Sequence, residues 1–199
     1  MYYYVARESR KNMLELNRFT TCCFSGYRPH KFSFPLKRNN ENFIELENNI
    51  TNAILDAYEK GYRNFLCGGA MGFDLVCGET VVLLKEKFPD IKLVMVLPYK
   101  NQPKRFPPDW RQRYDFVLSS ADHIYYFTEK YKKTAFIARN AKMVAHSSMI
   151  ITYYNGKPGG TENTIAIAQR DRLTIINLHN GSKKPYEKLS YYIGRRKEK

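Results

Sequence analysis

The sequence predicts a single α/β domain with a doubly wound, mostly parallel sheet and helices on both faces. Short β-rich apolar runs alternate with segments of helical periodicity through residues 19–178. The run at residues 91–97 (IKLVMVL) is apolar throughout, as expected for a strand that helices cover on both faces. With 199 residues and 43% hydrophobic content, the chain can bury a self-sufficient core without disulfide or metal staples.

Six apolar runs predict the strands. The first run ends before Gly26, the second before Gly68 and the fifth before Gly156, and glycine interrupts regular structure at such points. In chain order, the expected strands are residues 19–24, 63–67, 91–97, 123–127, 149–153 and 173–178.

Five segments between these runs predict helices. The first carries apolar residues at nearly 3.6-residue spacing and ends at Gly61. The second ends before Pro89, and the third begins near Asp109, an acid suited to a helix N-terminus. In chain order, the expected helices are residues 41–60, 73–88, 109–118, 134–146 and 161–170.

Positive charge is concentrated at the two ends of the chain. The formal net charge is +14, of which residues 182–199 carry +5 and residues 1–18 carry +2. We therefore expect one domain at residues 19–181, with an N-terminal accessory segment before it and a basic C-terminal tail after it. The remaining charge of +7 suits an anionic ligand, nucleic acid or an acidic partner.

Several protein classes are excluded. No window approaches the roughly 18 consecutive apolar residues of a membrane helix, and the first residues lack a secretory signal, which predicts a soluble, cytoplasmic protein without a membrane partner. The aromatic content of 15% argues against intrinsic disorder. The cysteines form no CxxC pair, so we expect buried thiols and no metal site at Cys22, Cys23, Cys67 and Cys77.

Glycine-bearing turns follow the first, second and fifth expected strands, and all three lie at the carboxyl edge of a parallel sheet, where ligands bind. Because glycine lacks a Cβ, backbone amides can approach a bound group, and the next helix directs its free N–H groups toward an anion. In a single turn of this kind, glycine can serve only to make the turn tight, whereas three such turns on one edge favour a phosphate site. The expected ligand-binding residues in these turns are Ser25, Gly26, Arg28, Gly68, Gly69, Ala70, Asp74, Gly159, Gly160 and Thr161.

Polar side chains in and near these turns suggest individual roles. Arg28 can contact phosphate or carboxylate in a bidentate manner. Asp74 can accept hydrogen bonds from a ribose diol or, alternatively, serve as a first-turn helix acid. Arg139 and Asn140, on the fourth expected helix, belong either to the site or to a solvated polar face.

These segments resemble the YpsA-like branch of the SLOG superfamily. The resemblance rests on residues 24–30 (FSGYRPH), 67–74 (CGGAMGFD), 139–144 (RNAKMV) and 154–164 (YNGKPGGTENT), and it covers about residues 20–178 with the motifs in the same order. The superfamily also contains LOG-type phosphoribohydrolases, the DNA-processing protein A fold and nucleotide-sensing domains of bacterial defence systems. The resemblance implies a Rossmann-like sheet with a pocket for a nucleotide or NAD-derived ligand.

The sequence departs from the hydrolases of this superfamily at one motif. LOG-type enzymes carry a PGGxGTxxE turn whose Glu contributes to hydrolysis of an N-glycosidic bond, whereas here the turn continues into Ile165 and Ala166 without an acid at that place. Asp74 and Glu162 remain as candidate catalytic carboxylates, and Glu162 also suits a first-turn helix acid.

Three functions follow from these observations. We favour binding or sensing of a nucleotide-like ligand, including one derived from NAD or ADP-ribose, with no other cofactor assigned. The first alternative is a nucleotide N-glycosidic bond hydrolase or a deoxyribosyltransferase-like enzyme. The second is single-stranded nucleic-acid binding by the basic segment 99–113 beside the aromatic residues Tyr99, Phe106, Trp110 and Tyr114. Related folds often pair through a helix, so a homo-oligomer is compatible with this reading.

Overall fold

The computed structural model describes residues 16–180, in which strands and α-helices alternate strictly along the chain. Four short 3-10 helices occur outside this alternation: η2 (Arg18–Thr20), η3 (Pro29–Lys31), η4 (Gln102–Arg105) and η5 (Leu178–Asn180). The main elements are β1 (Thr21–Gly26), α1 (Glu41–Glu59), β2 (Asn64–Cys67), α2 (Phe73–Lys85), β3 (Lys92–Tyr99), α3 (Pro108–Ser119), β4 (His123–Thr128), α4 (Lys133–Ala145), β5 (Met149–Tyr153), α5 (Gly160–Arg170) and β6 (Thr174–Asn177).

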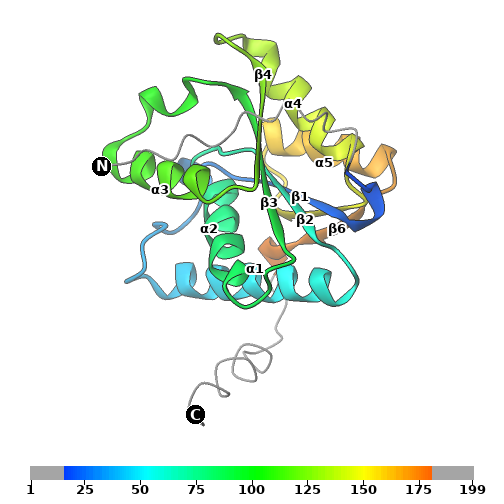
Figure 1. Cartoon of the computed structure of the whole chain (residues 1–199). Coiled ribbons are helices and arrows are strands. Elements are labelled where there is room, and N and C mark those ends of the chain that lie inside the picture. The colour runs from blue at the N-terminus through cyan, green and yellow to red at the C-terminus, as the bar shows by residue number, and fades with distance from the viewer. Residues whose placement is uncertain (1–15, 181–199) are drawn as a thin grey trace, which may run out of the picture.

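The strands form one six-stranded sheet in the order β4-β3-β2-β1-β5-β6, and every neighbouring pair is parallel (Figure 1). The chain builds the sheet outward from β1 to β4 and then returns to the other side of β1 with β5. The strand order therefore reverses between β1 and β5, as it does in Rossmann-like doubly wound sheets. This confirms the predicted fold class.

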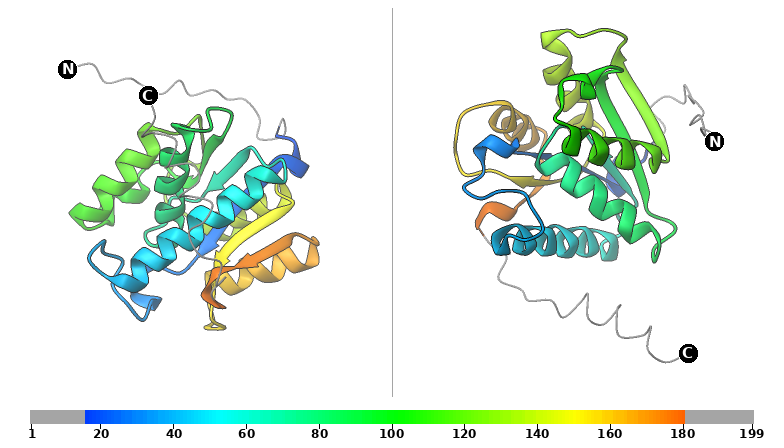
Figure 2. Two further views of the ribbon diagram at one scale, coloured as in Figure 1. Left: turned by 90° about the horizontal axis from the view of Figure 1, so that it is seen from below. Right: turned by 90° about the vertical axis from the view of Figure 1, so that its left-hand side faces the viewer.

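Helices cover both faces of the sheet. Helices α1, α2 and α3 form one layer, and α4 and α5 form the layer on the opposite face (Figures 1 and 2). Successive strand residues point to opposite faces, so Cys22 and Phe24 of β1 belong to the larger apolar cluster, under α1 to α3. Cys23, between them, belongs to the smaller cluster with Met143 and Val144 of α4.

The first strand begins later than the sequence predicts. Phe19 lies in η2 and is 78% exposed, because the side chain of Asn17 accepts a hydrogen bond from the Phe19 amide and holds the chain in a turn. Strand β1 begins at Thr21 and continues to Gly26, two residues beyond its expected end. The expected start of this strand at Phe19 is therefore wrong.

The described residues also bear on the other expectations about the chain. All four cysteines are free and buried, as predicted. Within residues 16–180, no cluster of His, Cys, Asp and Glu could hold a metal ion, and no helix has the length and hydrophobicity that crossing a membrane requires. The expected terminal segments lie outside the described residues, except for residues 16–18, where Arg18 donates hydrogen bonds to the Ser147 and Asp171 carbonyls.

Candidate functional site

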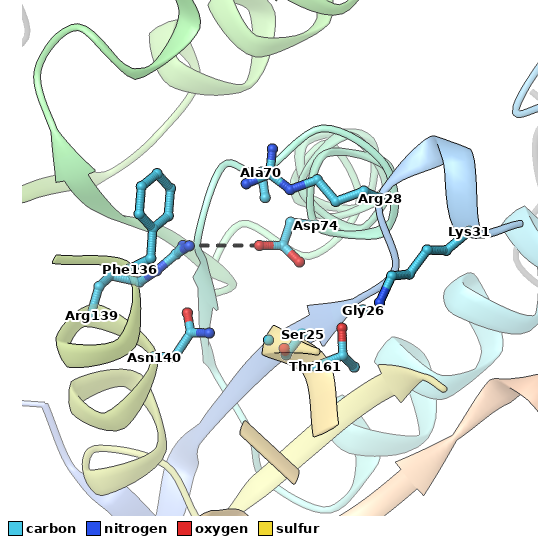
Figure 3. Close-up of a pocket in the computed structure, with 11 residues that line it drawn as sticks. Ser25, Gly26, Arg28, Lys31, Ala70, Asp74, Phe136, Arg139, Asn140 and Thr161 are labelled. Atoms are coloured by element: carbon cyan, nitrogen blue, oxygen red, sulfur yellow. Dashed lines mark ion pairs between the residues drawn. The ribbon is translucent and has the colours of Figure 1, made fainter. Parts of the chain in front are cut away.

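A cavity of about 280 Å³ lies at the carboxyl edge between β1 and β5, where the strand order reverses. Its walls come from the turn after β1, the start of α2, one face of α4 and the first turn of α5 (Figure 3). Open α/β sheets bind ligands in such crevices. The lining residues are Ser25, Gly26, Arg28, Lys31, Ala70, Asp74, Phe136, Arg139, Asn140, Gly160 and Thr161.

The cavity carries an excess of positive charge. Arg28, Lys31 and Arg139 contribute three cationic side chains, whereas Asp74 is the single carboxylate among the described residues that line it. Arg28 and Lys31 are half-buried, and they reach the cavity from the turn after β1 and from η3. A cavity with this charge balance attracts anions.

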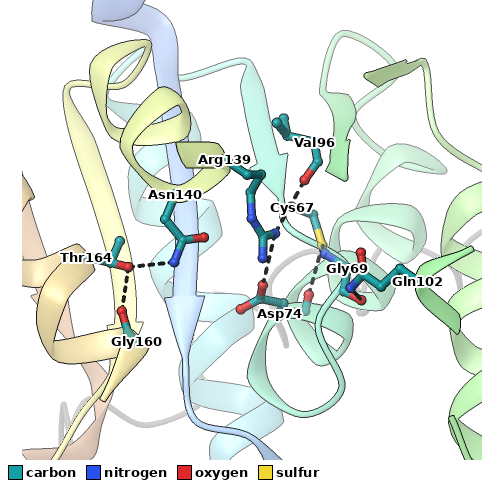
Figure 4. A network of polar contacts seen from close by, with 9 residues as sticks. All are labelled: Cys67, Gly69, Asp74, Val96, Gln102, Arg139, Asn140, Gly160 and Thr164. Carbon is teal, nitrogen blue, oxygen red and sulfur yellow. Dashed lines mark hydrogen bonds and ion pairs between the residues drawn. The ribbon is translucent and has the colours of Figure 1, made fainter. Parts of the chain in front are cut away.

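Arg139 and Asp74 form a buried ion pair at the floor of the cavity (Figure 4). The residues are 3% and 5% exposed, and 3.9 Å separates Nη1 of Arg139 from Oδ2 of Asp74. The same Nη1 donates a hydrogen bond to the Val96 carbonyl at 3.3 Å, whereas Nε has no hydrogen-bond partner among the described residues. Arg139 thus lies in the site and not on a solvated face.

Burial and pairing act in opposite directions on these two groups. Burial raises the pKa of Asp74, and the charges of Arg139 and Arg28 oppose that rise, as do hydrogen bonds from the amides of Ala70 and Gly26. Burial lowers the pKa of Arg139, and the charge of Asp74 opposes that fall. Each partner therefore offsets part of the desolvation of the other.

The turn after β5 is held in place by the turn after β1. The buried hydroxyl of Tyr27 donates to Oδ1 of Asn155 at 2.5 Å and accepts from the amides of Asn155 and Lys157 at 3.1 Å. Nearby, Nζ of Lys31 donates to the Pro158 carbonyl at 2.7 Å. These contacts fix the segment that leads into α5, and so fix the helix N-terminus at the cavity.

The three glycine turns have different roles. Gly160 lines the cavity, and a Cβ built there would meet no heavy atom within 4 Å. Gly68 and Gly69 do not line the cavity. Packing requires glycine at both positions, since a Cβ on Gly68 would overlap the Arg139 guanidinium and one on Gly69, whose φ is +64°, would lie 2.7 Å from Leu97. Gly159 also lies outside the lining, although the other nine expected binding residues line it.

Both candidate carboxylates lie in the first turn of a helix. Asp74 is the second residue of α2 and also lines the cavity. Glu162 is exposed, and its Oε2 accepts a hydrogen bond from the Gly159 amide at 3.3 Å, as a first-turn acid in a capping box does. Asn140 supports the same helix start, since its Nδ2 donates to the Thr164 hydroxyl, which donates to the Gly160 carbonyl (Figure 4).

Sequence reasoning missed two lining residues. Phe136 precedes Arg139 and Asn140 by three and four residues, so helical spacing already places all three on one face of α4. Lys31 carried no such signal, because η3 turns it toward the cavity only after the Gly-Tyr-Arg-Pro turn has formed.

Three of the four aromatic residues expected to bind nucleic acid in and beside segment 99–113 are not available for base stacking. Phe106 and Trp110 are buried in the core beneath α3, as is Tyr114 just beyond the segment. Arg113 forms a two-point contact with the Glu79 carboxylate at 2.6 Å. The expectation that Phe106, Trp110 and Tyr114 form an aromatic binding surface is therefore wrong, whereas Tyr99 is half-buried at the end of β3.

Comparison with known families matches the fold and the motifs. The model of the YspA SLOG family (YpsA) matches residues 22–174, which include the whole lining of the cavity. The chain belongs to the YspA SLOG family. Curated relatives of this family member include UPF0398 proteins of Bacillus cereus (strain B4264) and Bacillus thuringiensis (strain Al Hakam). They are 26% and 27% identical over 159 residues, which are 78% of this chain and 85% of each relative.

Two solved structures share the fold of this YspA SLOG protein. DNA processing protein A from Helicobacter pylori, described for its single-stranded DNA binding mode, aligns with a TM-score of 0.57 and 16% identity over 93% of this chain and 76% of its own. DNA processing protein A from Streptococcus pneumoniae aligns with a TM-score of 0.54 and 15% identity over 92% of this chain and 59% of its own.

Proposed function

We propose that this protein binds a nucleotide-like ligand, with the phosphate of that ligand held between Arg28, Lys31 and the first turn of α5. The observation that carries the proposal is the charge of the cavity. Three cationic side chains line it, and its one carboxylate, Asp74, is already paired with Arg139. An anionic ligand would offset the charge that the protein itself leaves uncompensated.

The start of α5 is the best-suited anion site in the cavity. Gly160 and Thr161 are the first two residues of this helix, whose backbone N–H groups have no partner within the helix, and the absence of a side chain at Gly160 leaves the approach open. The start of α2 is less suited, because its Phe73 amide already donates to the Tyr27 carbonyl and Asp74 supplies negative charge there.

The arrangement of carboxylates favours binding over hydrolysis of a glycosidic bond. General acid catalysis needs a carboxyl group positioned to reach the leaving group. Glu162 is exposed and outside the cavity lining, and Asp74 is engaged by Arg139 and by two backbone amides. A hydrolase or transferase reaction in this cavity would have to use Asp74.

Calorimetric titration with AMP, ADP-ribose and NAD tests the proposal. Arg28→Ala should weaken binding on the order of tenfold or more, the loss expected when a hydrogen-bonded charge is removed. Lys157→Ala is the matched control, because it removes an equal charge from an exposed residue near the cavity but outside its lining. Equal losses in both variants, or no binding by the wild type, would overturn the proposal, and chromatographic detection of released base would favour the enzyme.

Single-stranded nucleic acid is the second candidate, and a specific surface favours it. Lys130, Lys132 and Lys133 are exposed around the start of α4, whose first turn contains no acid and which contributes to the cavity wall. The solved structures with this fold include a protein described for its single-stranded DNA binding mode. A thymidine oligonucleotide should then bind with an affinity that falls steeply with salt. A complex insensitive to salt, or none at low salt, would exclude this candidate.

A further inference from the structure

The end of the cavity at α4 is aromatic. Phe136 lines the cavity, and the rings of Tyr99 and Tyr131 pack against it with centroid separations of 5.9 and 6.3 Å. Tyr99 and Tyr131 also contact each other, at 5.5 Å and an interplanar angle of 89°. The three residues come from the end of β3, from the segment after β4 and from α4, so they join separate parts of the carboxyl edge.

This aromatic cluster of Tyr99, Tyr131 and Phe136 is not explained by the hydrophobic core. None of its members belongs to either of the apolar clusters formed by the described residues, and Tyr131 is 62% exposed. Phe136 is half-buried, whereas the side chain of Ala135, the preceding residue of α4, is buried. Phe136, the member of this cluster that lines the cavity, is an aromatic side chain outside the core and is therefore suited to contact a ligand.

We propose that Phe136 forms a nucleobase subsite, on whose ring the flat base of the ligand stacks. This inference rests on the proposed function, because it concerns the base of the same ligand whose phosphate is bound at the other end of the cavity. Figure 3 shows Phe136 on the α4 side of the cavity and Lys31 on the opposite side, with Asp74 and Arg139 between them. One end of the cavity therefore presents an aromatic ring and the other presents cations and a helix N-terminus.

The chemistry of these two ends matches a base joined to a phosphate through a sugar. A base stacks on an aromatic side chain whatever its identity, since every base has a π face. The packing of Tyr99 at 82° to the ring of Phe136 restricts that ring and reduces the cost of ordering it on binding. A free mononucleotide and the terminal nucleotide of a single strand share this chemistry, so both can occupy the subsite.

The test compares ligands that differ only in the base. Wild-type protein should bind AMP on the order of tenfold more tightly than ribose 5-phosphate, because stacking on one aromatic side chain contributes about that factor. Phe136→Leu, which keeps an apolar side chain without the ring, should remove this difference and leave the affinity for ribose 5-phosphate unchanged. Phe136→Tyr should restore it.

Ile137→Ala is the matched control, because Ile137 is the next residue of α4, is 58% exposed and does not line the cavity. It should bind both ligands as the wild type does. If the wild type binds AMP and ribose 5-phosphate equally, or if Phe136→Leu weakens both equally, the subsite is refuted while the phosphate site stands. If the wild type binds neither compound, the proposed function fails with it.

Ligands of different length distinguish a free mononucleotide from the terminal nucleotide of a single strand. Thymidine 5′-monophosphate and a thymidine oligonucleotide should both lose affinity in Phe136→Leu if they use the subsite. Binding of the monophosphate alone identifies a small-molecule site, and tighter, salt-dependent binding of the oligonucleotide identifies a strand end. Loss of neither affinity in Phe136→Leu would refute stacking on Phe136 for both ligands.

Discussion

Asp74 should control how strongly the cavity holds an anion. Burial raises the pKa of this carboxyl above its usual range, and the charges of Arg139 and Arg28 oppose the rise. Acidification should therefore neutralise Asp74 in the folded protein at a higher pH than it neutralises an ordinary aspartate. Loss of its negative charge leaves the three cations uncompensated, so the affinity for sulfate should increase as the pH falls.

The variant Asp74→Asn isolates this effect. It should bind sulfate at neutral pH more tightly than the wild type and lose most of the pH dependence, as measured by calorimetry. His30, in the neighbouring η3, is present in both proteins, so the difference between the two profiles reports on Asp74. A carboxyl whose folded pKa is raised also adds stability as the pH falls through that pKa. Identical sulfate profiles in the two proteins would contradict the assignment.

A side chain at Gly160 should block the cavity without disturbing the fold. A Cβ there meets no heavy atom within 4 Å, so the branched side chain of Gly160→Val would extend into the open approach to α5. We expect loss of AMP binding with a melting midpoint within roughly 2–4 °C of the wild type, which corresponds to about 1 kcal/mol in a domain of this size.

Ala166→Val provides the control for that substitution, because it places the same side chain on an exposed position of α5 outside the cavity lining. It should leave AMP binding intact. Gly69→Val would be a poor test of the same idea, since the positive φ of Gly69 and the proximity of Leu97 predict damage to the fold itself. Retention of AMP binding by Gly160→Val would show that the ligand does not reach α5.

The cysteine thiols should be inert in the native protein. All four are buried, and burial raises their pKa values, to about 12 for Cys23. Since the thiolate is the reactive species, an aromatic disulfide reagent should modify no cysteine in the folded protein and all four after unfolding in guanidinium chloride. Rapid modification of any thiol under native conditions would show that part of the core opens readily.

At the scale of elements, the connection between β5 and α5 should depend on one hydroxyl. Tyr27 makes three hydrogen bonds to the segment that leads into α5, and the ring itself packs on Phe32, Tyr153 and Tyr154. Tyr27→Phe keeps this ring packing but removes these three hydrogen bonds, so that only the 3.3 Å bond from the Lys157 amide to Oδ1 of Asn155 still holds the segment on itself. We expect sulfate affinity to fall several-fold, because the start of α5 is no longer held at the cavity.

Two measurements distinguish this positioning role from a general loss of stability. Amide hydrogen exchange in Tyr27→Phe should increase in residues 154–160 and remain unchanged in α2, which the hydroxyl does not contact. Thr51→Val removes a hydroxyl hydrogen bond within α1, outside the cavity lining. It should weaken neither exchange protection in residues 154–160 nor sulfate binding. Faster amide exchange throughout the sheet would show that the Tyr27 hydroxyl stabilises the whole domain and does not specifically position the start of α5.

The elements were predictable where the pattern is local. Strand β5 has the bounds that the apolar run predicts, and α1 ends one residue before its expected end. The start of β1 was not predictable from apolarity, because Asn17 caps a short 3-10 helix that removes Phe19 from the strand. Local hydrogen bonding of this kind competes with strand formation and leaves no hydrophobic signal.

At the scale of the whole molecule, the sheet order explains which parts of the site could be foreseen. Parallel strands put the turns after β1, β2 and β5 on one edge, which is why seven of the ten binding residues expected in these turns line the cavity. Whether a turn glycine lines the cavity or makes room for a neighbouring side chain depends on packing across the sheet. Gly68 is required by the Arg139 guanidinium from α4, which is 71 residues away in the chain, and no sequence pattern reports that contact.

Deletion of the basic C-terminal tail should leave the folded domain intact. Among the described residues, the last strand is β6, and it is followed by η5, which ends at Asn180. Removing residues 181–199 deletes a net charge of +5 and retains every described strand of the sheet and every described residue of the cavity lining. The shortened chain should therefore melt cooperatively, within roughly 2–4 °C of the full chain, and should bind AMP with unchanged affinity.

If nucleic acid is a ligand, the salt dependence of oligonucleotide binding should differ between the shortened chain and the full chain. Each phosphate contact that the tail makes contributes about 0.7 to the slope of log affinity against log salt for a single strand, so deletion of a participating tail should make that slope shallower. A shortened chain with Lys130, Lys132 and Lys133 replaced by alanine should then lose the remaining dependence. If the shortened chain instead loses cooperative melting, residues 181–199 are part of the folded domain, and the domain boundary near residue 181 is wrong.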